Sequence, residues 1–104
     1  MWKILFSAEA ERETKDQFRK GLLTDEDREV ISTWIKQIAE YGPESLREGS
    51  NFWYDHDLQG EWRGYRASAF SFKGRIIYKI ENRIVTVLVV RITTAHDYKK
   101  ARDK

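Results

Sequence analysis

Residues 74–92, GRIIYKIENRIVTVLVVRI, place two segments rich in β-branched residues on either side of a short polar interval. This pattern favours two antiparallel strands, over 74–81 and 83–92, joined as a hairpin. Arg83 stands in the connection, where a two-residue turn would prefer glycine. The second segment is apolar on both of its faces in its middle part, so we expect it at the buried centre of a sheet.

Two helices are predicted in the first half of the chain. Residues 8–20 are polar and rich in helix formers, and Gly21 follows as a helix stop. Thr24 precedes three acidic residues, a pattern typical of a capped helix start. An apolar stripe at helical spacing then predicts an amphipathic helix that ends near Tyr41, before a glycine–proline pair. The stripe consists of Val30, Ile31, Trp34, Ile35 and Ile38.

Two further strands complete the predicted sheet. Residues 2–7, WKILFS, are apolar enough for a central strand, and residues 61–70 are expected to form the strand before the hairpin. Residues 42–52 are predicted as a loop or a weak helical turn. The order β-α-α-β-β-β predicts an α+β fold in which two helices pack on one face of a small, largely antiparallel sheet. The other face would be free to bind a ligand, and residues 1–104 would form a single domain.

Composition excludes several classes of protein. The chain has no cysteine, so a disulfide framework and a thiolate metal site are both excluded. The apolar start turns acidic too early for a signal peptide, and VLVV is far too short to cross a membrane. We therefore expect a soluble, cytoplasmic protein with no membrane partner.

The charge is divided unevenly between the two halves. Residues 1–50 carry 8 Lys and Arg against 11 Asp and Glu, a balance of −3, whereas residues 51–104 carry 11 against 6, a balance of +5. The division suggests that the second half faces a polyanion. Ordinary scatter of surface charge is the alternative.

Cations of the second half are predicted to share the free face of the sheet. Alternation along 74–81 places Arg75 and Lys79 on that face, opposite the apolar residues that face the helices. Arg66 on the preceding strand and Lys73 in the turn would join them in one concave patch. The alternative is that these cations only protect an edge strand from aggregation.

The two histidines flank the predicted sheet. His56 precedes the strand at 61–70, between two aspartates, and His96 follows the last strand, two residues before Tyr98. Adjacent residues rarely chelate one ion, so we predict no metal site and no cofactor. If the segments share one rim of the sheet, the imidazoles and cations together suit metal-independent RNA cleavage. That reaction needs a base for the 2′-hydroxyl proton, cations around the phosphorane and an acid for the leaving oxygen.

Aromatic side chains around the cations suit the same ligand. Trp53, Tyr54 and Tyr65 are candidates to stack an unpaired base. For Trp62 and Tyr78 a place in the core is the favoured interpretation.

The segment DHDLQGEWRGYR, followed by GRIIYKI and an apolar strand, resembles the YafQ branch of the RelE/ParE toxin superfamily. The matching motif positions are His56, Leu58, Gly60, Trp62, Gly64, Tyr65 and Arg66. The resemblance is specific over residues 55–92 and only architectural before them. It implies the RelE-like toxin fold.

The resemblance also implies a function and partners. It implies the toxin of a type II toxin–antitoxin system, an endoribonuclease that cuts mRNA in the A site of the 30S ribosomal subunit, beside the 16S rRNA. It further implies a cognate antitoxin that wraps and neutralises the toxin. Two alternatives stay open on the same fold: a ParE-like inhibitor of DNA gyrase, and a binding module without catalysis.

Roles follow from the resemblance residue by residue. The implied catalytic residues are His96, Arg75, His56 and Tyr98. The residues expected to hold RNA or its phosphates are Lys73, Arg66, Lys79, Arg63 and Tyr65. The chain departs from the YafQ pattern at 67–73, ASAFSFK, where a further histidine and an aspartate are missing, and Lys73 is the expected replacement. The His-Arg pair customary near the end of the last strand is missing too, and the assignment of acid and base is therefore open.

Overall fold

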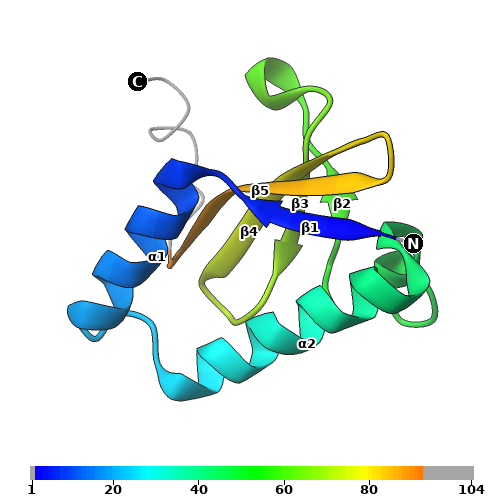
Figure 1. Cartoon of the computed structure of the whole chain (residues 1–104). Coiled ribbons are helices and arrows are strands. Elements are labelled where there is room, and N and C mark those ends of the chain that lie inside the picture. Colours follow the sequence, from blue (N-terminus) through cyan, green and yellow to red (C-terminus); the bar gives the residue numbers. More distant parts are fainter. Residues whose placement is uncertain (1, 93–104) are drawn as a thin grey trace.

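The computed structural model describes residues 2–92 as an α+β fold built on one five-stranded sheet (Figure 1). The helices are α1 (Ala8–Arg19) and α2 (Asp25–Tyr41), with the short 3₁₀ helices η1 (Pro43–Arg47) and η2 (Gly60–Trp62). The strands are β1 (Lys3–Phe6), β2 (His56–Asp57), β3 (Arg66–Ala69), β4 (Gly74–Glu81) and β5 (Ile84–Ile92). The predicted fold class is confirmed.

The strand order in the sheet is β1-β5-β4-β3-β2, with β1 parallel to β5 and every other pair antiparallel. β5 therefore lies between β1 and β4, as its apolar sequence predicted. The expectation that residues 2–7 form a central strand is wrong, because β1 is an edge strand. Its burial alternates, with Ile4 and Phe6 half-buried and Lys3 and Leu5 exposed, as suits a strand covered on one face only.

Both helices contribute buried side chains to the core on the same face of the sheet. Ile31, Trp34 and Ile38 of α2 are buried in one cluster with residues of β4 and β5, and Ala10 of α1 joins them. Thr24 begins α2 with a capping box, in which its hydroxyl accepts from Asp27 N–H and the Asp27 carboxylate accepts from Thr24 N–H. The predicted amphipathic helix is thus confirmed.

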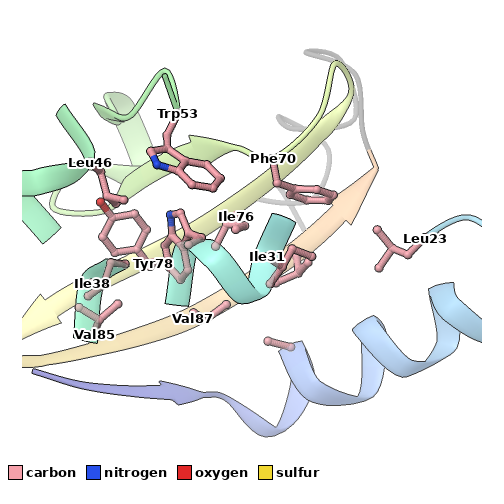
Figure 2. Packing of buried hydrophobic residues seen from close by; sticks show 13 residues of the cluster. Leu23, Ile31, Ile38, Leu46, Trp53, Phe70, Ile76, Tyr78, Val85 and Val87 are labelled. Carbon is pink, nitrogen blue, oxygen red and sulfur yellow. The ribbon is translucent and has the colours of Figure 1, made fainter. Parts of the chain in front are cut away.

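Figure 2 shows the buried core cluster, in which Tyr78 of β4 lies near Ile38 of α2. Trp34 and Tyr78 are both fully buried, and their rings meet edge to face with centroids 5.3 Å apart. The Trp34 indole N–H donates to the Ser68 hydroxyl at 2.9 Å, so its one polar atom is satisfied inside the core. These contacts fix α2 against β3 and β4.

The hairpin between β4 and β5 forms at the predicted place without glycine. Asn82 and Arg83 both adopt positive φ, 50° and 63°, the conformation of a type I′ turn. The predicted strand at 61–70 is shorter than expected, since only Arg66–Ala69 pairs as β3. The residues before it form η2, and Gly60 and Gly64 there have positive φ, which interrupts an extended strand.

A β-bulge interrupts the β4–β5 ladder. Tyr78 pairs with Val87 but the neighbouring Ile77 pairs with Val89, so Leu88 is an extra residue on β5. Beyond the bulge the alternation of β5 is reversed, and Arg91 lies on the same face as Arg75.

The side chain of Gln17 completes the sheet where β1 ends. β1 pairs with β5 only as far as Val87. Further along, the Gln17 amide donates to Val90 C=O at 2.6 Å and accepts from Ile92 N–H at 3.0 Å. A buried side-chain amide thus takes the place of a neighbouring strand.

Among residues 2–92, no helix is both long and apolar enough for a membrane span.

Candidate functional site

The face of the sheet opposite α2 carries its own small apolar cluster, and we call it the open face. Ala67, Ile77 and Leu58 are buried in this cluster, with Val89, Tyr65 and Trp62 packed against them. The Trp62 and Tyr65 rings meet edge to face at 5.2 Å. Within residues 2–92, no residue of α1 or α2 belongs to this cluster, so neither helix packs directly on it.

His56 lies at the edge of the open face. It pairs with Ala67 across β2 and β3, and Ala67 pairs in turn with Ile77 of β4. Directly opposite residues in an antiparallel pair share a face. The exposed His56 side chain therefore points to the open face, and its Nδ1 lies 2.9 Å from Tyr54 C=O.

The flanking aspartates point the other way. Asp55 is buried, and its Oδ1 accepts from Arg47 Nε at 2.7 Å and from Arg66 Nη2 at 3.1 Å. Its Oδ2 accepts from the hydroxyls of Ser68 and Tyr78. Asp57, exposed, accepts from Arg47 Nη2 at 2.8 Å. The side chains of the DHD triplet thus alternate between the two faces of the sheet. The carboxylates of Asp55 and Asp57 are bound on the helix side, and the imidazole of His56 lies on the open face.

The Asp55 network shifts the pKa values of its members. Burial, reinforced by the adjacent Asp55 charge, raises the pKa of the Tyr78 phenol far above its usual range. Burial lowers the pKa of Arg47, but its hydrogen bonds to Asp57 and Asp55 outweigh that effect and raise it. The Arg47 hydrogen bond lowers the pKa of Asp57. Asp57 and the arginines are therefore charged and Tyr78 is neutral at physiological pH.

Two predicted ligand-binding residues belong to the opposite face. Arg66 pairs with Tyr78 and lies with its guanidinium 5.5 Å from that ring, bonded to Glu44 and Asp55. The prediction that Arg66 joins the patch on the open face is therefore wrong, because the strand alternation places it beneath the sheet. Trp53 is buried in the core with its indole N–H bonded to Gln37, so it cannot stack a base.

The open face does present Arg75 and Lys79, as predicted from alternation along β4. Arg75 Nη1 donates to the carbonyls of Ser71, Phe72 and Gly74, which clamps the turn before β4. Lys79 Nζ lies 3.6 Å from a Glu81 carboxylate oxygen.

The remaining predicted residues divide by position. Lys73 is exposed in the turn between β3 and β4, and Arg63 is exposed after η2. Tyr65 lies in the apolar cluster of the open face. His96 and Tyr98 lie outside the described residues. No group of three or more potential metal ligands occurs within residues 2–92.

A groove of about 980 Å³ separates α1 from the open face. Its walls include Trp62, Tyr65 and Val89 on the sheet side and the carboxylates Glu9 and Asp16 on the helix side. Arg91 projects into this groove and forms an ion pair with Glu13 of α1. The position of Arg91 on this face is not predictable from the sequence, because the bulge that places it opposite Arg75 has no sequence signal.

Comparison with known proteins supports the fold. No protein-family model matches the chain, and no curated protein matches it significantly. Among solved structures, YafQ from E. coli BL21(DE3) superposes with a TM-score of 0.72 at 17% identity, covering 94% of this chain and 99% of that one. A YoeB–YefM complex from Staphylococcus aureus contains a chain with a TM-score of 0.67 at 17% identity, with coverage of 90% and 99%. The E. coli DinJ–YafQ complex contains a chain with a TM-score of 0.66 at 16% identity, covering 88% of this chain and 93% of that one.

These similarities extend over nearly the whole of each chain, so they apply to the complete arrangement of helices and strands rather than to one motif. The chain has the fold of the YafQ and YoeB toxins.

Proposed function

We propose that the protein is the toxin of a type II toxin–antitoxin pair and a metal-independent endoribonuclease that cuts mRNA on the ribosome. The observation that carries the proposal is the open face, where His56 and Arg75 come from separate strands of a YafQ-like sheet. Neighbouring strands lie about 4.8 Å apart, so two strand steps and two residues separate their Cα atoms by roughly 12 Å. Both side chains can then reach one bound nucleotide.

The reaction divides between these groups by their chemistry. An imidazole can both accept and donate a proton, so His56 is suited to move the proton of the attacking 2′-hydroxyl or of the leaving 5′-oxygen. Within residues 2–92, Arg75 uses only Nη1 in hydrogen bonds, and its Nε and Nη2 remain for phosphate oxygens. Lys73 and Lys79 would add positive charge along the RNA backbone. His96 and Tyr98 stay predicted as the second proton-transfer group and its companion.

A cognate antitoxin is part of the proposal. YoeB has been solved with YefM, and YafQ with DinJ. An antitoxin that covers the open face would mask His56 and Arg75 together.

Primer extension on cellular mRNA after brief induction tests the activity. We expect cuts at codon-spaced positions that end in a 2′,3′-cyclic phosphate, and cutting by the purified chain only when ribosomes are present. His56→Ala should slow cleavage about 100- to 10,000-fold, the range for a lost proton-transfer group. Intact mRNA together with DNA-damage signalling would contradict the proposal and support gyrase inhibition instead.

A further inference from the structure

Three large aromatic side chains project into solvent at one end of the open face. Phe72 is 91% exposed, Tyr54 is 74% exposed and Phe52 is 71% exposed. Together with Ala69, Phe70 and Arg75 they line a hollow of about 400 Å³, which we call the aromatic pocket. Exposed apolar side chains are common singly, but three aromatic rings around one hollow indicate a binding surface.

The rings are presented by backbone that is fixed in place. Arg75 Nη1 binds three carbonyls of the turn that carries Phe72. The loop with Phe52 and Tyr54 is attached to β3 through a 2.7 Å hydrogen bond from Ala69 N–H to Trp53 C=O. Phe70 also lines the pocket, and Gly74 makes room for its ring, since a Cβ at Gly74 would lie 2.4 Å from the Phe70 ring. The pocket is therefore preformed.

Tyr54 occupies an unfavourable backbone conformation. Its φ is 49°, in the left-handed region that bulky residues rarely adopt. The conformation is imposed by hydrogen bonds around it, from Asp55 N–H to Asn51 Oδ1 and from Asn51 Nδ2 to Asp55 C=O. Strain of this kind at an exposed aromatic residue points to a functional role for its side chain.

We propose that the aromatic pocket holds one unpaired base of the RNA substrate by stacking, and that Arg75 holds the adjoining phosphate. This inference rests on the proposed function and adds the residues that bind the base and the phosphate of the substrate. Within residues 2–92 no carboxylate lines the pocket, and Arg75 is among its lining residues. Aromatic faces beside a cation match the two parts of a nucleotide. The Tyr54 carbonyl also contacts His56 Nδ1, which connects the pocket to the proposed catalytic imidazole.

Binding of a short single-stranded 2′-O-methyl RNA tests the pocket, because this probe lacks the 2′-hydroxyl and cannot be cleaved. Loss of one stacked base corresponds to roughly 5- to 150-fold weaker binding, the loss expected for Phe72→Ala in the purified full chain. Phe72→Trp should bind within about twofold of the unsubstituted chain, whereas Phe72→Leu should bind as weakly as Phe72→Ala. The matched control is Tyr41→Ala, since Tyr41 is 70% exposed but lies at the end of α2, away from the pocket.

Tyr54→Gly gives a second variant that keeps the fold. Glycine tolerates the left-handed backbone, so this variant should unfold at a midpoint no lower than the unsubstituted chain and yet bind the probe more weakly. Undiminished probe binding by Phe72→Ala, or no measurable binding by the unsubstituted chain, would overturn the pocket.

Two outcomes distinguish base stacking from protein docking and from catalysis. If Phe72→Leu binds the probe like the unsubstituted chain, or if the substitutions weaken antitoxin capture instead of RNA binding, the surface is an apolar protein-docking site and the proposal is overturned. If the chain binds the probe through Phe72 and Tyr54 but never cuts mRNA, the nuclease proposal fails while the pocket stands.

Discussion

Arg75 and Arg91 lie directly opposite each other in the β4–β5 ladder, with both side chains on the open face. Like charges in this position repel each other, and Glu13 neutralises only Arg91. The sheet therefore tolerates a repulsive pair at the place where the proposed function needs positive charge for a phosphate.

Arg75→Ala separates function from stability. Relief of the repulsion, about 0.2–1 kcal/mol, offsets the lost carbonyl contacts, so the free energy of unfolding should change by less than about 1 kcal/mol. Cleavage should fall about 100- to 1,000-fold, as for the loss of a donor to a transition state. Urea unfolding and ribosome-dependent cleavage measure the two effects. Lys36→Ala, at an exposed position of α2, is the control and should leave both unchanged.

Asp55→Asn should be the most damaging polar substitution that keeps the shape of the side chain. It leaves the half-buried guanidinium of Arg66 and that of Arg47 without their shared carboxylate, which costs about 3–5 kcal/mol of stability. The comparison is Asp57→Asn, which removes an exposed partner of the same Arg47 and should cost far less stability, because water screens that ion pair. Equal losses in urea unfolding would show that the buried network does not anchor this loop.

Because the pKa of Tyr78 is raised in the folded chain, we expect the protein to lose stability at alkaline pH. Its pKa in the folded chain lies above its ordinary value of 10.0, so the folded state keeps the phenolic proton after the unfolded chain has lost it. The raised pKa of Tyr78 therefore contributes its full share to the free energy of unfolding below pH 10. Above pH 10 the free energy of unfolding declines by about 1.4 kcal/mol per pH unit.

Tyr78→Phe removes this dependence. At neutral pH the variant should be less stable by about 1.5–3 kcal/mol, because Asp55 loses a donor. The gap between the two proteins should then narrow as the pH rises beyond 10. Parallel curves of unfolding free energy against pH would contradict the assignment.

Gln17→Leu tests the side chain that completes the sheet. The change leaves the carbonyl of Val90 and the N–H of Ile92 without their partner, and we expect a loss of about 1–3 kcal/mol in urea unfolding. Hydrogen exchange at Ile92 should speed up by more than exchange in β4. Lys15→Ala, an exposed change on the same helix, should alter neither quantity.

Local sequence signals were sufficient for most of the fold. The spacing from Val30 to Ile38 predicted α2, and the two β-branched segments gave β4 and β5 almost to the residue. The strand before the hairpin was overextended because Trp62 and Tyr65 suggest a strand, whereas the positive φ of Gly60 and Gly64 prevents one.

The site was less accessible to prediction because it depends on which face each side chain occupies. A simple count back from the hairpin turn pairs Arg75 with Val90, and only the extra residue Leu88 brings Arg91 opposite it. That residue lies in a run apolar on both faces, which conceals the change of alternation. For Arg66, the sequence shows a cation on a strand but not the register that pairs it with Tyr78 and places it beneath the sheet.

The amide of Gln17 has a consequence for how copies of this protein meet one another. Unpaired strand borders are where separate chains join into larger sheets and aggregates. Beyond Val87, the backbone groups on the β1 side of β5 are hydrogen-bonded by the Gln17 side chain and not by a strand. Association through the sheet, whether with a second copy or a foreign segment, is thereby directed to the outer borders of β1 and β2.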